Sequence, residues 1–139
     1  MSSAPDRSGP LEQFLLVAVG EHACALPVPR VRSVVPALNV FPLPATDPNL
    51  LGLAEYEGEP LPIFDLAGLV GAPPGPAAEF PVTVVVRAGG GEAVGLAADA
   101  ALRLATLPGA GVGSGVVREA VEMDGKVVHV LDLEALGGR

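Results

Sequence analysis

The chain has 139 residues, 50% of them hydrophobic, which is enough to build the core of one ordinary domain. Its 16 acidic residues against 8 basic ones give a formal net charge of −8, which would repel nucleic-acid phosphates and anionic membranes. No apolar run approaches the roughly 20 residues that a membrane-spanning helix needs. From the acidic charge and the lack of such a run together, we expect a cytoplasmic protein that neither binds nucleic acid nor inserts into a membrane.

The chain opens with a segment that predicts no secondary structure. Residues 1–12 contain several Ser and Pro residues and predict a disordered tail. Two apolar runs follow, Phe14–Val19 and Ala23–Leu26, and they predict strands joined by a Gly-containing turn. The single cysteine, Cys24, lies inside the second run, where a buried thiol behaves as a small hydrophobe. A reactive thiol is the alternative interpretation.

The next segment, residues 28–35, predicts the one short helix of the fold. Four apolar residues recur there at helical spacing: Val28, Val31, Val34 and Val35. Pro29 suits the first turn of a helix, and Pro36 would end it.

The rest of the chain reads as short strands bounded by Gly and Pro, so that the fold has about ten strands in all. The further predicted strands are Asn39–Phe41, Leu50–Tyr56, Leu61–Phe64, Pro81–Arg87, Glu92–Ala97, Ala101–Leu107, Val116–Met123 and Val127–Leu131. The Pro- and Gly-rich residues 71–79 predict a linker. It divides a single domain, residues 13–136, into subdomains of about residues 13–70 and 80–136.

An internal repeat relates the two subdomains. Gly58 and Gly125 lie 67 residues apart, and so do Asp65 and Asp132, each of which is followed by Leu. In both copies a hairpin tip leads into an apolar strand and then into a short turn, which indicates a duplication. The glycines suit positive φ in a tight turn, and the aspartates suit capping of the helical turn that follows. We therefore predict an all-β fold of two five-stranded barrels packed side by side, with one short helix.

No reaction centre is recognisable in the sequence. Neither His22 nor His129 has a metal ligand at suitable spacing, and the glycine-rich residues 109–115 lack the Gly-Lys-Ser/Thr ending of a phosphate loop. We expect no cofactor, no metal and no enzymatic activity. The alternative is an enzyme or small-ligand-binding barrel with Asp65, Asp99 or His129 at the mouth of a pocket.

Acidic residues gather around one predicted hairpin tip. Glu55, Glu57 and Glu59 alternate along it, each separated from the next by one residue. They predict either a solvated rim or a charged docking edge for a basic partner.

The stretch Gly52–Leu66 resembles the central motif of the CheW family, whose members couple chemoreceptors to a histidine kinase in bacterial signalling arrays. The resemblance covers a glycine, an apolar strand, a hairpin and a final Pro-x-x-Asp-Leu. The structural positions of the motif and its second copy are Gly52, Gly58, Pro62, Asp65, Gly125 and Asp132. Residues 94–99 and 124–133 are similar to later parts of the family pattern, so that the resemblance runs almost from end to end.

The resemblance implies a non-enzymatic adaptor of two SH3-like five-stranded barrels with an apolar groove between them. In the family this groove receives the tip of a chemoreceptor (methyl-accepting chemotaxis protein), and the barrel ends meet the regulatory domain of the kinase. By position, one groove wall would consist of Val28, Val31, Val34 and Val35, and the other of Leu96 and Ala98.

Several residues depart from the family pattern, among them Pro27, Pro36 and Glu119. Glu57 stands where the motif has Arg, and Ser33 stands where Glu is usual. Because a reversed charge turns an attraction into a repulsion, we expect altered or partial partner binding at Glu57.

Overall fold

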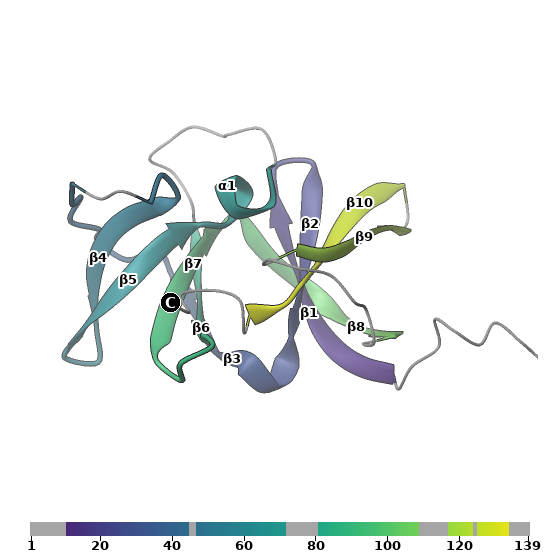
Figure 1. Cartoon of the computed structure of the whole chain (residues 1–139), viewed down its shortest axis with the longest axis horizontal. Helices are drawn as coiled ribbons and strands as arrows, with labels where there is room; N and C mark the ends of the chain where they lie inside the picture. The colour runs from purple at the N-terminus through teal and green to yellow at the C-terminus, as the bar shows by residue number, and fades with distance from the viewer. Residues whose placement is uncertain (1–10, 45–46, 72–80, 109–116, 124, 134–139) are drawn as a thin grey trace, which may run out of the picture.

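The computed structural model describes residues 11–44, 47–71, 81–108, 117–123 and 125–133, and this part of the chain is mostly β-structure. Its strands form two five-stranded sheets, and its one α-helix, α1, is only Leu66–Val70. Figure 1 shows the two sheets side by side with α1 between them. Among the described residues, no helix has the length and apolar character that crossing a bilayer requires.

The first sheet, sheet A, joins strands from both ends of the chain. In spatial order it contains β8 (Ala100–Pro108), β1 (Leu11–Val19), β2 (His22–Pro27), β10 (Lys126–Leu131) and β9 (Val117–Met123). The second, sheet B, contains β3 (Val31–Pro36), β6 (Val82–Arg87), β7 (Ala93–Ala98), β5 (Glu59–Asp65) and β4 (Leu50–Tyr56). One neighbouring pair in each sheet is parallel, β2–β10 in sheet A and β5–β7 in sheet B, and the other pairs are antiparallel.

The two sheets are not the two halves of the chain, which corrects the predicted division at residues 71–79. Strands β1 and β2 belong to the first predicted subdomain but pair with β8 and β10. Strands β6 and β7 belong to the second but pair with β3 and β5. A hydrophobic pattern shows that a strand has a buried face but not which strand lies beside it. Apart from Gly71, the predicted linker lies outside the described residues.

The strand order supports the internal duplication. If β1–β5 and β6–β10 exchange places, the order of sheet A becomes the order of sheet B. The first hairpin of each copy therefore lies in the sheet of the other copy: β1–β2 lies with β8–β10, and β6–β7 lies with β3–β5. Gly58 and Gly125, in the turns β4–β5 and β9–β10, have φ of 81° and 78°, which confirms the predicted positive φ.

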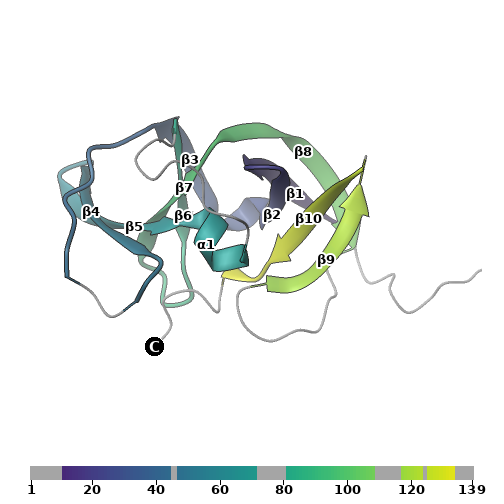
Figure 2. The same ribbon diagram turned by 90° about the horizontal axis from the view of Figure 1, so that it is seen from above.

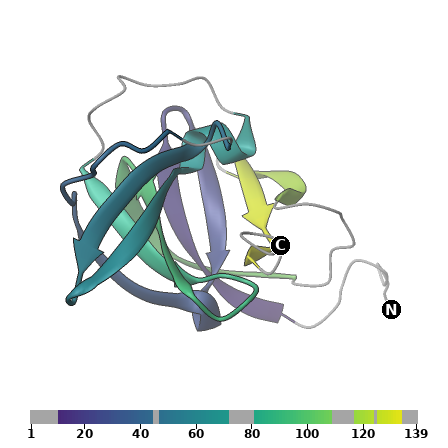
Figure 3. The same ribbon diagram turned by 60° about the vertical axis from the view of Figure 1, so that its left-hand side comes forward.

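Both sheets curve, as Figures 2 and 3 show, but neither closes by strand pairing among the described residues. The edge strands of sheet A are β8 and β9, and those of sheet B are β3 and β4. In sheet B the two edges are joined through side chains, because the hydroxyls of Ser33 on β3 and Tyr56 on β4 are hydrogen-bonded at 2.7 Å. The closed SH3-like barrels implied by the resemblance are thus not confirmed, whereas the two five-stranded sheets are.

The largest apolar core lies between the sheets and holds side chains from both of them and from α1. We call it the inter-sheet core. Its largest fully buried members are Val17, Leu26, Leu66, Val84, Val86, Leu96, Leu131 and Leu133. Each sheet also has a smaller core on its other face. Cys24 is fully buried in the inter-sheet core, as predicted, and burial raises the pKa of its thiol to about 12.

Residues 28–35 are not a helix, contrary to the prediction. Val28–Arg30 form a single 3₁₀ turn, η1, and β3 follows with alternating half-buried and exposed residues. The branched Cβ of valine restricts χ1 in a helix and packs well on a pleated sheet. Pairing with β6 then satisfies the backbone of β3.

The one helix of the described residues begins directly after Asp65 instead. Asp65 is its N-cap residue, but its carboxylate makes no capping hydrogen bond, so only the position of the predicted cap is confirmed. Gly71 ends the helix with φ of 73°, and its N–H donates to the carbonyl of Gly68 at 3.2 Å. Asp132 precedes Leu133, which has 3₁₀ conformation, and the residues that follow lie outside the described part.

Most strands lie within two residues of their predicted bounds, with two differences. The predicted strand Asn39–Phe41 is reduced to an isolated bridge between Phe41 and Leu53. Strand β1 begins at Leu11, inside the predicted tail of residues 1–12, because Leu11 and Glu12 pair with the end of β8. Residues 1–10 lie outside the described residues.

Candidate partner-binding surfaces

The inter-sheet core continues to the surface along β1 and β8. Leu15 is half-buried against this core, and its register partner on β8 is Leu104. Leu104 is 56% exposed, and Leu102 and Leu11 on the same two strands are 49% and 68% exposed. We call these four leucines the β1–β8 apolar face. Leu11 lies beyond the polar pair Gln13–Thr106, at the end of the two strands. Exposed leucines beside a core are typical of a surface that another protein covers.

The predicted valine wall is split between several environments. Val28, in η1 next to β1, is half-buried, and Val31 packs against the inter-sheet core. Val34 is 42% exposed, whereas Val35 packs into the smaller core of sheet B. Since neighbouring residues of a strand face opposite sides, these four valines cannot form one wall. Only Val28 and Val31 lie near the β1–β8 apolar face.

The other predicted wall lies inside the protein. Leu96 and Ala98 are 0% and 2% exposed and belong to the inter-sheet core, so no partner can contact them in the folded state. Their strand, β7, is covered because it lies in the middle of sheet B. The sequence interpretation missed Leu11, Leu102 and Leu104. Leu102 and Leu104 lie on the edge strand β8, and Leu11 is the first residue of β1. No local pattern reports these positions.

A hollow of about 530 Å³ opens beside the β4–β5 hairpin. Its lining residues are Arg32, Tyr56, Glu57, Glu59, Pro60, Leu61, Pro62, Glu92 and Ala93. Strands β5 and β7 are paired only from Ile63 to Asp65 on β5. Pro60 and Pro62 come before this stretch and have no backbone N–H to donate, so the ladder does not extend toward the hairpin tip.

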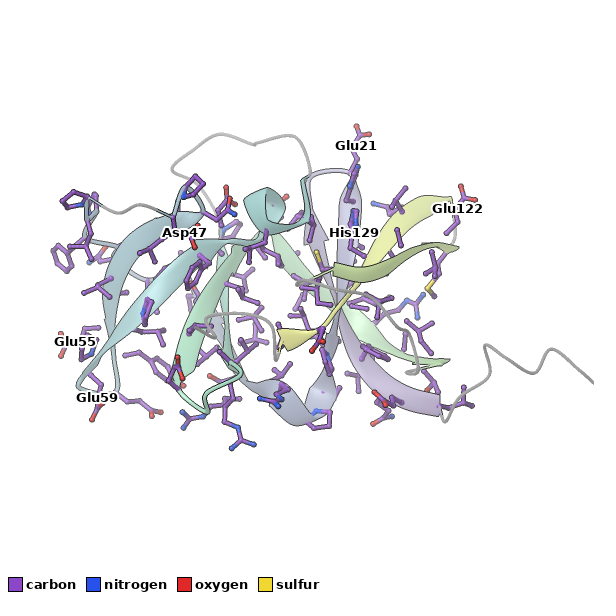
Figure 4. The ribbon with its side chains drawn as sticks, viewed as in Figure 1. Glu21, Asp47, Glu55, Glu59, Glu122 and His129 are labelled. Carbon is purple, nitrogen blue, oxygen red and sulfur yellow. The ribbon has the colours of Figure 1, made fainter. Side chains whose placement is uncertain are left out.

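The hollow is predominantly acidic. Glu57, Glu59 and Glu92 line it together with one cation, Arg32, and none of the four forms an ion pair with another described residue. Glu57 has φ of 53° and precedes Gly58 in the hairpin turn, which fixes it at the tip. Figure 4 shows Glu59 and Glu55 at this end of the hairpin. The arrangement favours a cationic side chain as occupant.

Residues proposed for an enzymatic alternative do not contact one another. The carboxylate of Asp99 accepts a hydrogen bond from the backbone N–H of Gly20 at 2.6 Å, and His129 bonds to His22. Asp65 lies at the start of α1. In the described part of the chain, no three His, Cys, Asp or Glu side chains are grouped to hold a metal ion.

Comparison with known proteins gives one consistent answer. A family model described as the CheW-like domain matches residues 13–138. Among solved structures, the scaffolding protein TtCheW from Thermoanaerobacter tengcongensis is similar with a TM-score of 0.72 and 18% sequence identity, covering 89% of this chain and 90% of that one. At this identity the likeness concerns the fold. No curated protein matches the sequence.

Proposed function

Because the chain belongs to the CheW-like domain family, we propose that it is a non-enzymatic cytoplasmic adaptor that links chemoreceptors to a histidine kinase in a bacterial chemosensory pathway. The β1–β8 apolar face supports the receptor half of this proposal most strongly. Its exposed leucines border the inter-sheet core, so that a receptor helix placed there would extend an existing apolar contact. Burial of these side chains would supply most of the binding free energy.

Changing Leu104 to Arg tests the receptor contact. We expect receptor capture to fall by about tenfold or more, because a desolvated charge replaces a side chain that the helix would bury. The matched control is Leu43→Arg, since Leu43 is 44% exposed but lies in the β3–β4 connection. Val31 is a less suitable site for the arginine substitution than Leu104, because Val31 packs against the inter-sheet core and an arginine there would disturb the fold.

The measurement is a pull-down with a receptor cytoplasmic fragment, with circular dichroism as a check on folding. Unchanged capture by a folded Leu104→Arg protein would remove the β1–β8 apolar face from the proposal. Equal losses in Leu104→Arg and Leu43→Arg would also do so, because the effect would then come from added charge alone.

The acidic hollow is the second contact of the proposal. The family resemblance implies that barrel ends meet the regulatory domain of the kinase and that the residue at position 57 is Arg, and we assign the acidic hollow to the kinase contact. Here Glu57 shares the hollow with Glu59 and Glu92, which would repel an acidic partner surface and attract a basic one. We therefore propose that a conventional kinase regulatory domain binds weakly and that the true partner presents Lys or Arg to the hollow.

Glu57→Arg tests the charge reversal. It should strengthen binding to a conventional kinase regulatory domain about fivefold, which corresponds to roughly 1 kcal/mol. Glu55→Arg is the matched control, because it makes the same charge change at an exposed residue of β4 that does not line the hollow. Isothermal titration calorimetry gives the affinities. A tight complex with the wild-type protein, or equal gains in both variants, would contradict the proposal.

A further inference from the structure

The only two histidines of the chain meet in the structure. Nδ1 of His22 and Nε2 of His129 are 2.9 Å apart, although the residues are separated by 107 positions. The ring centroids are 5.1 Å apart and the planes differ by 22°. For two imidazoles with a 2.9 Å contact between ring nitrogens, the centroid distance is largest when both nitrogens lie on the line that joins the ring centres. The observed centroid distance is close to that maximum, so the two nitrogens point at each other. The rings thus meet edge to edge, in a geometry that lets an N–H of one ring donate to the nitrogen of the other.

The pair lies where two hairpins of sheet A are joined. Strand β10 connects the β9–β10 hairpin to the rest of the sheet through its parallel pairing with β2. This pairing is short and covers only Val128–Val130 against Ala23–Ala25. We call it the β2–β10 seam. On the opposite face of the strands, Val128 and Val130 pack against Ala23 and Ala25 in a small apolar core.

The strands around the pair contribute few titratable groups to its face. On β2 the nearest is Cys24, the register partner of His129, and burial holds its thiol neutral by raising its pKa to about 12. The register partner of His22 on β1 is Val19. The register partner of His129 on β9 is Ala120, which carries no charge.

Three carboxylates lie nearby but do not pair with the rings. Glu21 lies in the β1–β2 turn, and Asp99, between β7 and β8, is already bonded to the N–H of Gly20 in that turn. Glu122 lies on β9, two residues beyond Ala120. Figure 4 shows Glu21 and Glu122 directed outward, away from His129. Neither imidazole forms an ion pair with a described carboxylate.

We propose that His22 and His129 form a proton-operated clasp at the β2–β10 seam. The clasp is closed while at least one imidazole is neutral, and uptake of a second proton opens it and loosens the β9–β10 hairpin from β2.

The chemistry of imidazole gives the reason. An N–H···N bond needs one nitrogen with a free lone pair, and two imidazolium rings have none. Their positive charges would also stand in contact, with no described carboxylate paired to either of them. Consistent with this geometry, desolvation and then the charge of His22 lower the pKa of His129. The two protons should therefore bind in separate steps, which belong to the pair as a whole.

Nuclear magnetic resonance titration of the whole protein tests the coupling directly. We expect the Hε1 signals of His22 and His129 to report two coupled steps, the second of them below the ordinary value of about 6.5. His129→Gln and His22→Asn place non-titrating amides where Nε2 and Nδ1 lie. Either variant should abolish the coupled second step, and in His22→Asn the pKa of His129 should rise but stay below its ordinary value, because desolvation still lowers it. Independent titration of the two wild-type histidines, unchanged by either substitution, would overturn the proposal.

Amide hydrogen exchange tests the opening. Between pH 7.5 and pH 5, protection of the β10 amides, corrected for intrinsic exchange, should fall by about tenfold, because the open form binds the second proton more readily. The β6 amides, on an interior strand of sheet B, should keep their protection. In His129→Gln this fall should be much smaller. If His129→Gln does not fold, His22→Asn replaces it, and a reduced fall is expected there because desolvation still lowers the pKa of His129. An equal fall of β10 protection in the wild-type protein and in the variant would show that the histidines do not control the opening of the β2–β10 seam.

Discussion

At Gly52 the backbones of two segments lie against each other. A Cβ at this position would collide with the carbonyl group of Phe41, and Gly52 has φ of 151°, which side-chain-bearing residues rarely adopt. The neighbouring residue, Leu53, forms the bridge to Phe41 through N–H···O bonds of 2.8 and 3.0 Å. The glycine that the family motif places here is therefore required by close packing of main chains.

Gly52→Ala should lower the free energy of unfolding by about 2–3 kcal/mol, because backbone must move to admit the methyl group. Gly20→Ala is the control: Gly20 has φ of 62° but open space around it, so it should cost only the conformational term of about 1 kcal/mol. Urea denaturation measures both. Equal losses would mean that the contact with Phe41 contributes nothing.

Cys24 should make stability sensitive to alkaline pH. Burial raises its pKa from 9.0 to about 12, so the folded state disfavours the thiolate. The corresponding stabilisation is complete below about pH 9 and is lost as pH rises from 9 toward 12, because the unfolded chain ionises first. Cys24→Ala should flatten this part of the stability curve measured by urea denaturation. The same slope in both proteins would assign it to other groups.

At the scale of elements, the hydroxyl pair Ser33–Tyr56 joins the two edges of sheet B. The hydrogen bond is 2.7 Å long and part-buried, and it links β3 to the strand that leads into Glu57. Ser33 and Glu57 are also two of the residues that depart from the family pattern. The structure thus places these two departures next to Tyr56, one through a hydrogen bond and the other as its neighbour in the chain.

A double-mutant cycle with Ser33→Ala and Tyr56→Phe measures this link. Each change removes one hydroxyl while keeping most of the side chain, and each should lower the free energy of unfolding by about 1 kcal/mol. The double variant should lose little more than either single one, so that the coupling is also about 1 kcal/mol. Additive losses would show that the two hydroxyls do not stabilise the sheet together.

Residues 28–35 show why element type could not be predicted everywhere. Val28, Val31 and Val35 fit helical spacing, whereas in the strand Val31 and Val35 pack into cores on opposite faces of sheet B. The alternation is obscured because the register with β6 shifts between Val31 and Ser33, and because Ser33 is polar and meets Tyr56. The choice was decided by β6, which offers a pairing partner from about 50 residues further along the chain.

At the scale of the whole molecule, the exchange of hairpins between the two copies ties the sheets together. Sheet A contains β1 and β2 with β8–β10, and sheet B contains β3–β5 with β6 and β7. Both also contribute to the inter-sheet core. Neither predicted half of the chain can complete a sheet alone, so we expect the sheets to unfold together.

The chain offers separate probes for this prediction. It has no Trp and a single Tyr, so the fluorescence of Tyr56 reports on sheet B, while the signals of His22 and His129 report on sheet A. In urea the two probes should give one coincident transition. Two separated midpoints would mean that the sheets are independent units, as the predicted division of the sequence into halves implies.

The all-β class, most strand bounds, the glycine turns and the family could be predicted from local patterns of residues. These follow from alternation, from backbone angles that only glycine tolerates easily, and from a motif contained within Gly52–Leu66. Tertiary structure alone decided which strands pair, which leucines stay exposed and which valines are buried. It also brought His22 to His129, and Ser33 to Tyr56. The reason is that pairing and burial depend on contacts between distant segments, whose free energy is not encoded in any local pattern.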